Sequence, residues 1–157
     1  MTRILATGSI DRTMPKNTAS MKVGRLLEVR AAAGYRTPAD VDAIFGEIGA
    51  ALGRLPAGAE HVTVVDWRQC PLMAPEAAQH MLRMIASVNA NTLRSAALAS
   101  DSSPTAVLQF VRVIRDANLP DRKLFVRSDE LRDWLAEVLT PAEAARLDEF
   151  LAESPNG

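Results

Sequence analysis

The chain has 157 residues, of which 48% are hydrophobic and 24% charged, a composition typical of one globular domain rather than of a disordered chain. Its formal net charge is -1 at pH 7, and no run approaches the roughly 20 apolar residues of a membrane-spanning helix, so we expect neither general nucleic-acid binding nor a membrane span. Cys70 is the only cysteine and cannot form an intrachain disulfide, which is typical of a cytoplasmic protein.

Residues 1–22 do not follow one clear pattern of secondary structure. Residues 4–6 are apolar and could form a short strand, whereas residues 8–9 and 14–17 are typical of a loop. We expect this N-terminal arm to be poorly ordered or to pack as an edge strand of a sheet.

From residue 23 onward, strand patterns alternate with helix patterns. The best strand pattern is residues 61–67, whose β-branched run favours burial on both faces of a parallel sheet. Three further strands show weaker alternation or shorter apolar runs, and are predicted at 24–31, 93–99 and 123–126. The helices have apolar residues three or four positions apart, and are predicted at 37–55, 74–88, 103–118, 128–138 and 140–151.

Such alternation requires parallel neighbouring strands joined by right-handed crossovers. We therefore predict an α/β domain over residues 23–139, followed by a C-terminal helix and tail at 140–157. Thr37 is the predicted N-cap of the first helix, and Thr140 and Glu143 have the spacing of a capping box at the start of the last one.

The order of elements resembles the STAS superfamily of anti-sigma-factor antagonists and their SpoIIAA-like relatives over residues 23–139. The resemblance depends on the strand 62–66 (VTVVD), the loop and helix after it, and the ending 123–135 (KLFVRSDELRDWL). It implies four to five mostly parallel strands with four to five helices. It also implies a non-enzymatic regulatory module that binds another protein.

The chain departs from this family after the central strand. In anti-sigma-factor antagonists the loop there leads to an Asp-Ser pair at the next helix start, and a partner kinase phosphorylates that serine. The corresponding stretch here is 72–76 (LMAPE), in which Ala74 and Pro75 have no hydroxyl group. The resemblance therefore implies the scaffold and its binding surface without the usual phosphorylation switch.

The predicted partner-binding surface is the loop 66–76 and the helix after it. This loop follows the carboxyl end of a central strand, where ligands and partners meet open parallel sheets. An exposed tryptophan, arginine and methionine would form a hot spot of binding energy. Two alternatives stay open: Trp67 and Leu72 could pack over the end of the sheet, and Asp66 could hold Arg68. The candidate residues are Asp66, Trp67, Arg68, Leu72, Met73 and Glu76.

The segment 100–104 (SDSSP) lies between a predicted strand and a predicted helix. It lacks glycine and any nucleotide-binding fingerprint, so Ser103 is interpreted first as a helix N-cap. Ser102 and Ser103 are nevertheless the candidate phosphorylation or anion sites, because added negative charge is favourable at a helix N-terminus.

The two histidines do not have the spacing of metal ligands, so we expect neither a metal site nor a cofactor.

Two other functions stay open from the sequence alone. Some relatives of the fold hold apolar ligands between a helix and the sheet, which would make the chain a small-molecule or lipid-binding sensor or carrier. The small residues that could leave room for such a ligand are Ala77, Ala78, Ala96, Ala97 and Ala99.

A Cys-dependent hydrolase would use Cys70 near a helix start with His80, whereas His61 should lie at the opposite end of the sheet.

The last predicted helix carries an apolar stripe of Leu147, Phe150 and Leu151. This stripe can pack on its own domain or pair with a second copy of the chain as a homodimer. The sequence favours the first of these slightly.

Overall fold

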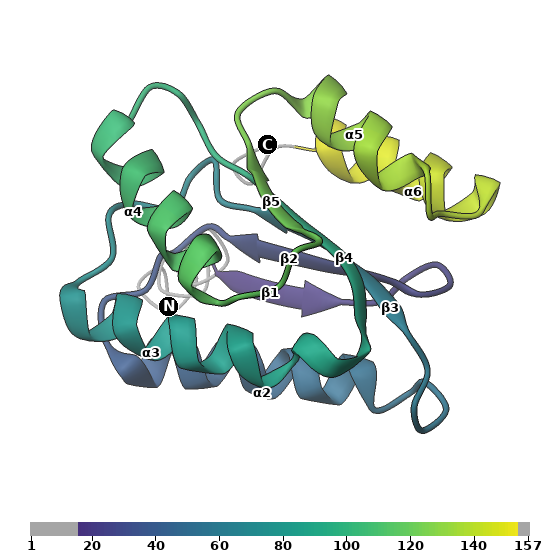
Figure 1. The fold of residues 1–157 in the computed structure, drawn as a ribbon, viewed down its shortest axis with the longest axis horizontal. Coiled ribbons are helices and arrows are strands. Elements are labelled where there is room, and N and C mark those ends of the chain that lie inside the picture. Colours follow the sequence, from purple (N-terminus) through teal and green to yellow (C-terminus); the bar gives the residue numbers. More distant parts are fainter. Residues whose placement is uncertain (1–15, 154–157) are drawn as a thin grey trace, which may run out of the picture.

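The computed structural model describes residues 16–153, so the strand predicted at 4–6 lies outside the described part. One five-stranded sheet has the order β1-β2-β3-β4-β5 (Figure 1). β1 pairs antiparallel with β2, and the other neighbouring pairs are parallel. The strands are β1 (Asn17–Ser20), β2 (Leu26–Ala31), β3 (His61–Asp66), β4 (Thr92–Leu98) and β5 (Arg122–Phe125). The predicted α/β fold is confirmed, and β1 is the N-terminal edge strand.

The helices cover the sheet on both faces (Figure 1). One face packs against α2 (Pro38–Leu52), α3 (Pro75–Ser87) and α4 (Pro104–Asp116). The other face packs against α5 (Ser128–Ala136) and α6 (Pro141–Ala152). A short 3-10 turn, η1 (Asn89–Asn91), precedes β4.

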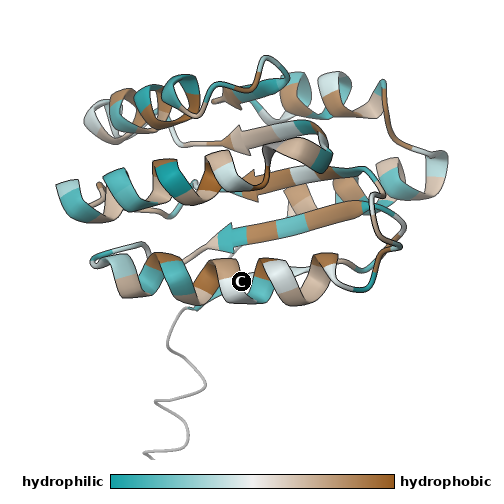
Figure 2. Cartoon of the chain, turned by 60° about the horizontal axis from the view of Figure 1, so that its bottom comes forward, coloured by the Kyte–Doolittle hydropathy of each residue, from teal (hydrophilic) through white to brown (hydrophobic). Residues whose placement is uncertain are grey.

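Side chains on β3 alternate between these two faces, as strand geometry requires. Val62 and Val64 pack with Leu26 against α5 and α6, whereas Val65 packs on the α2–α4 side. The predicted burial of this strand on both faces is confirmed. Figure 2 shows that the strands are mainly hydrophobic, whereas the helices carry both hydrophilic and hydrophobic segments.

The N-caps predicted for the first and last helices are both present. Thr37 Oγ1 accepts a hydrogen bond from Asp40 N at 3.3 Å, and Thr140 Oγ1 accepts one from Glu143 N at 3.2 Å. In both helices the acidic side chain bonds back to the cap residue, which completes a capping box. Short-range sequence signals therefore determine where α2 and α6 begin.

The apolar stripe on α6 packs on the domain's own sheet. Leu147 and Phe150 are fully buried in a cluster with Leu26, Val62 and Leu131. Of the two arrangements predicted for this stripe, the intramolecular one is observed, so these side chains are not available to a second copy.

Glu143 also joins α6 to the turn before β2. Its buried carboxylate accepts hydrogen bonds from Thr140 N at 2.9 Å and from Arg25 N at 2.6 Å. Gly24, immediately before Arg25, has φ +57°, and a Cβ atom there would overlap the Glu143 carboxylate. A side chain at position 24 would therefore meet both backbone strain and a steric clash.

Gly24→Ala should destabilise the domain by about 1–3 kcal/mol, because the left-handed backbone and the clash with Glu143 act together. Gly49→Ala is the matched control, since Gly49 lies within α2 with nothing within 4 Å of its Cβ position. That control should be neutral or more stable by about 0.5–1 kcal/mol. Urea unfolding followed by circular dichroism measures both changes. Equal effects of the two substitutions would contradict this account of Gly24.

Candidate functional site

Asp66 ends β3 as the centre of a buried ion network rather than as an exposed group. Its side chain has 0% exposure and accepts hydrogen bonds from Arg30 Nη1 at 2.8 Å and Arg68 Nε at 2.9 Å. The same arginines donate to the end of α6, at Phe150 O (2.8 Å) and Leu151 O (3.2 Å). The alternative in which Asp66 holds Arg68 is thus the one observed, and Asp66 does not face solvent.

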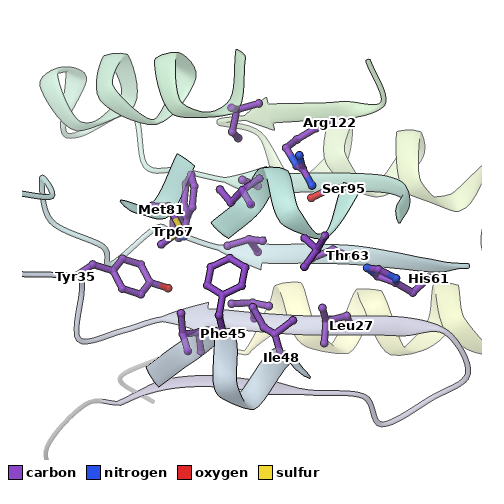
Figure 3. Close-up of a pocket in the computed structure, with 17 residues that line it drawn as sticks. Leu27, Tyr35, Phe45, Ile48, His61, Thr63, Trp67, Met81, Ser95 and Arg122 are labelled. Carbon is purple, nitrogen blue, oxygen red and sulfur yellow. The ribbon is translucent and has the colours of Figure 1, made fainter. Parts of the chain in front are cut away.

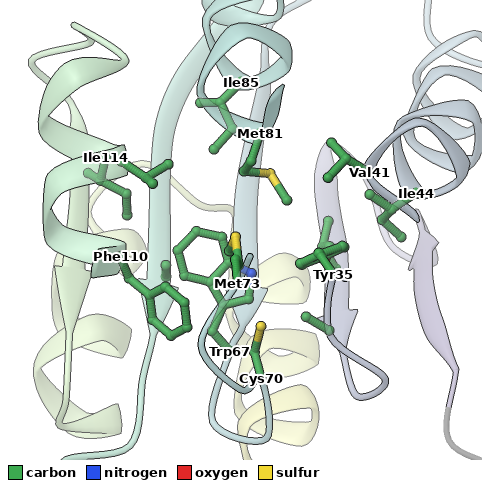
Figure 4. Close-up of a cluster of buried hydrophobic side chains, with 14 of the residues drawn as sticks. Tyr35, Val41, Ile44, Trp67, Cys70, Met73, Met81, Ile85, Phe110 and Ile114 are labelled. Atoms are coloured by element: carbon green, nitrogen blue, oxygen red, sulfur yellow. The ribbon is translucent and has the colours of Figure 1, made fainter. Parts of the chain in front are cut away.

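Trp67 and Met73 are also buried, at 3% and 2% exposure. Of the two arrangements left open for Trp67 the packed one is therefore observed, and the predicted exposure of Met73 is wrong. The cause is α4, which lies against the loop (Figure 4). Its Phe110 ring lies 4.8 Å from the Trp67 ring, centroid to centroid. Its Gln109 side chain donates to Met73 O and accepts from Met73 N, each at 2.8 Å.

The accessible part of the predicted surface is centred on Leu72 and Glu76. Leu72 is 54% exposed and Glu76 is exposed, while the Arg68 side chain is partly exposed. Leu72 and Glu76 line a groove of about 650 Å³ between α3 and α4, which Leu108, 70% exposed, also borders. We call this feature the α3–α4 groove. The loop therefore contributes Leu72 and Glu76 to a surface, while Asp66, Trp67 and Met73 support it from within.

Ser102 and Ser103 are both exposed before α4. Ser103 occupies the N-cap position, but its side chain makes no capping hydrogen bond, which corrects the interpretation of its hydroxyl. Ser102 Oγ lies 2.7 Å from Ser100 Oγ. Their suggested role as phosphorylation or anion sites stays a prediction.

Cys70 and His80, the two groups of the suggested hydrolase, do not have the surroundings that nucleophilic catalysis needs. Cys70 is buried, and burial raises the pKa of its thiol to about 12, so the reactive thiolate is scarce at neutral pH. His80 Nε2 lies 2.6 Å from Asp42 Oδ1, and this contact joins α3 to α2 on the surface.

Among residues 16–153 no cluster of three or more His, Cys, Asp or Glu could hold a metal ion, and no helix could cross a membrane.

A cavity lies between the sheet and helices α2 and α3 (Figure 3), in the kind of position that the ligand-binding alternative requires. Its volume is about 60 Å³, and apolar side chains from both helices and from the sheet form most of its wall. We call it the interior cavity. Of the small residues expected to leave room for a ligand, Ala97 lines it, whereas Ala96 packs on the opposite face of the sheet.

The floor of the interior cavity has two rows of side chains. Thr63 pairs with Ser95, and Ser95 with Arg122, in the register of β3, β4 and β5, so these three form a polar row. Two residues further along the strands, the corresponding apolar row consists of Val29, Val65 and Ala97. The alternating residues of 61–67 (H-x-T-x-V-x-W) are the part of the cavity floor that β3 contributes, and this alternation is visible in the sequence. The register that places β4 and β5 beside them is not.

His61 lies beside the polar row. Thr92 Oγ1 uses its proton to donate to Val88 O at 2.6 Å, so at 3.3 Å it accepts from His61 Nε2. Burial, and then the positive charge of Arg122, lower the pKa of His61. Burial lowers the pKa of Arg122 to about 10, which still leaves its guanidinium charged at neutral pH. Arg122 is therefore the charged group of the cavity floor.

Tyr35 and Trp67 lie at the other end of the interior cavity (Figure 3). Burial raises the pKa of the Tyr35 hydroxyl, and the nearby Trp67 N–H only partly offsets this. The two groups form no hydrogen bond of acceptable geometry, since Trp67 Nε1 is buried without a partner.

Comparison with known proteins identifies the fold. No protein-family model and no curated protein matches the sequence. Among solved structures, the chain is similar to an uncharacterised protein of the DUF3478 family with a SpoIIAA-like fold from Shewanella loihica PV-4, with a TM-score of 0.56 and 20% identity. The match covers 78% of this chain and 95% of that one. The predicted SpoIIAA-like fold is confirmed.

His61 should make the domain sensitive to acid. Because its folded pKa lies below the unfolded value of 6.5, the unfolded chain binds the proton first. Stability is therefore complete above pH 6.5 and is lost as the pH falls through the folded pKa. His61→Gln should reduce the fall in unfolding free energy between pH 7.5 and pH 5, measured by urea titration. Thr92→Val, which keeps the imidazole, should preserve that fall; an unchanged fall in His61→Gln would contradict the assignment.

Proposed function

We propose that this SpoIIAA-like domain is a non-enzymatic binding protein for a small, mainly apolar molecule held in the interior cavity. The observation that carries the proposal is the composition of the cavity wall. Apolar helix side chains face a sheet floor that contains the buried groups Thr63, Ser95 and Arg122. Packing alone favours apolar residues at such positions, because buried polar groups cost free energy unless they find partners.

The size of the interior cavity constrains how a ligand enters. At about 60 Å³ it is smaller than the roughly 150 Å³ cavity that accepts benzene in an engineered protein. A ligand of more than a few heavy atoms must therefore displace a side chain. Phe45 of α2 is the best candidate, because its ring lies over the middle of the cavity (Figure 3) and is only partly buried.

The absence of catalysis is part of the proposal. Cys70, the only thiol, is buried with a pKa raised to about 12 by that burial. His80 is bonded to Asp42 on the surface of α2 and α3. These surroundings favour a packing role for the thiol over a nucleophilic one.

Fluorescence of Trp67 tests ligand binding directly, because this side chain lines the interior cavity. In a Trp134→Phe background, titration with n-alkanols of four to ten carbons should shift the Trp67 emission saturably. The reciprocal Trp67→Phe variant reports from Trp134, which packs with Phe125 on the other side of the sheet, and should not respond. Phe45→Ala should extend binding to longer alkanols. If no alkanol gives a saturable shift, the proposed function is wrong.

A second candidate function is the docking of a partner protein on the α3–α4 groove, the regulatory role implied by the family resemblance. The specific observation is the exposure of Leu72 and Leu108 on either side of the groove. Exposed apolar side chains around a concave surface are typical of interaction sites. In this proposal Leu72, Glu76 and the partly exposed Arg68 contact the partner, while Trp67 and Met73 act by shaping the loop.

The double variant Leu72→Asp, Leu108→Asp tests the docking proposal. Native mass spectrometry of protein purified gently from its host should show a partner polypeptide with the original chain and lose it with the double variant. Val126→Asp is the matched control, because Val126 is 46% exposed but lies outside the groove. A partner that persists in the double variant places docking elsewhere.

A further inference from the structure

We propose that the molecule bound in the interior cavity is an apolar carboxylate whose charged end lies on the polar row of Thr63, Ser95 and Arg122. This inference depends on the proposed ligand-binding function and deepens it by naming the ligand class. It follows from the sign of the charge in the cavity and from the order of its two rows.

The lining of the interior cavity carries positive charge and no negative charge. Its residues include Arg122 and no aspartate or glutamate. His61 contributes no second positive charge at neutral pH, since burial and Arg122 both keep its imidazole neutral. An anion therefore gains favourable electrostatic energy there, whereas an ammonium group would be repelled in surroundings of low polarity.

Arg122 also suits a carboxylate geometrically. Arg122 already interacts within the protein, so a bound carboxylate would share its guanidinium, which has five N–H donors in all. Figure 3 shows its head directed towards Ser95, whose hydroxyl can donate to the same anion. Planar guanidinium groups bind carboxylates through paired hydrogen bonds, which are stronger than bonds between neutral groups.

The position of the apolar row indicates where the hydrocarbon part of the ligand lies. Val29, Val65 and Ala97 lie two residues along the strands from the polar row, about 7 Å away at the usual rise of a strand. A hydrocarbon chain attached to the bound carboxylate would lie over Val65 and Ala97, towards Trp67. Ala97 provides the space, because a larger side chain there would fill the floor of the cavity.

The charge of the site favours a carboxylate over a phosphate monoester. A phosphate monoester carries up to two negative charges, and Arg122 would balance only one of them. One carboxylate matches the single formal charge of the floor.

Three ligands of equal chain length test the head group on the Trp134→Phe protein: hexanoate, hexan-1-ol and hexan-1-amine at pH 7.5. We expect hexanoate to bind at least about tenfold more tightly than hexan-1-ol by Trp67 fluorescence and calorimetry. Hexan-1-amine should give no saturable signal. Hexyl phosphate should bind more weakly than hexanoate.

Substitutions then test whether the carboxylate of the ligand lies on the polar row. Arg122→Met should abolish the preference for hexanoate while hexan-1-ol still binds, and Ser95→Ala should reduce that preference severalfold. Arg94→Met is the matched control, since Arg94 on the same strand as Ser95 bonds to Trp134 O and Glu137 on the opposite face. It should leave the preference unchanged.

The outcomes separate this inference from the function on which it depends. Equal binding of hexanoate and hexan-1-ol would overturn the carboxylate and leave the proposed function intact. A preference for hexanoate that survives in a folded Arg122→Met protein would overturn the placement on the polar row. Failure of every hexyl ligand and every alkanol would overturn the proposed function itself. If Arg122→Met does not fold, the comparison of the hexyl ligands still tests the carboxylate, and Ser95→Ala still tests its placement on the polar row.

Discussion

The buried carboxylate of Asp66 is the interaction on which the functional half of the molecule depends. It joins β2 through Arg30, the loop after β3 through Arg68, and the end of α6 through both arginines. Loss of one partner from such a network would leave an uncompensated buried charge, at a cost of about 3–5 kcal/mol. Because neighbouring residues face opposite ways at the end of β3, holding Asp66 towards α6 directs Trp67 towards the interior cavity.

The two faces of the sheet consequently have different properties. The α5–α6 face is closed by apolar packing and by a second ion cluster, in which Arg146 bonds to the buried Glu28 at 2.8 Å. The α2–α4 face contains the interior cavity, the unpartnered Trp67 Nε1 and the α3–α4 groove. The buried carboxylates of Asp66, Glu28 and Glu143, with their hydrogen-bond and ion-pair partners, thus lie on the α5–α6 side, whereas the cavity and the groove lie on the other side. That division is typical of a scaffold that carries a site.

Local signals in the sequence were sufficient for the elements and the fold. Capping at Thr37 and Thr140 and the apolar run of β3 predict elements that the structure contains. The burial of Met73 was not predictable, because it depends on Gln109, 36 residues later in the chain. The polar row was missed for the same physical reason: Thr63, Ser95 and Arg122 become neighbours only through strand register, which no local pattern determines.

Helix α3 connects the two proposed binding features, since it borders both. Met81 and Ile85 face the interior cavity, while Ala78 and Leu82 face the α3–α4 groove one turn away or less. A ligand that displaces Met81 or Ile85, rather than Phe45 alone, would shift α3 relative to α2 or α4. Any such movement changes the groove on its other side. Because linkage is reciprocal, a partner that prefers one position of α3 must change ligand affinity by the same factor. Ligand binding in the cavity and partner binding in the groove would then be coupled through α3.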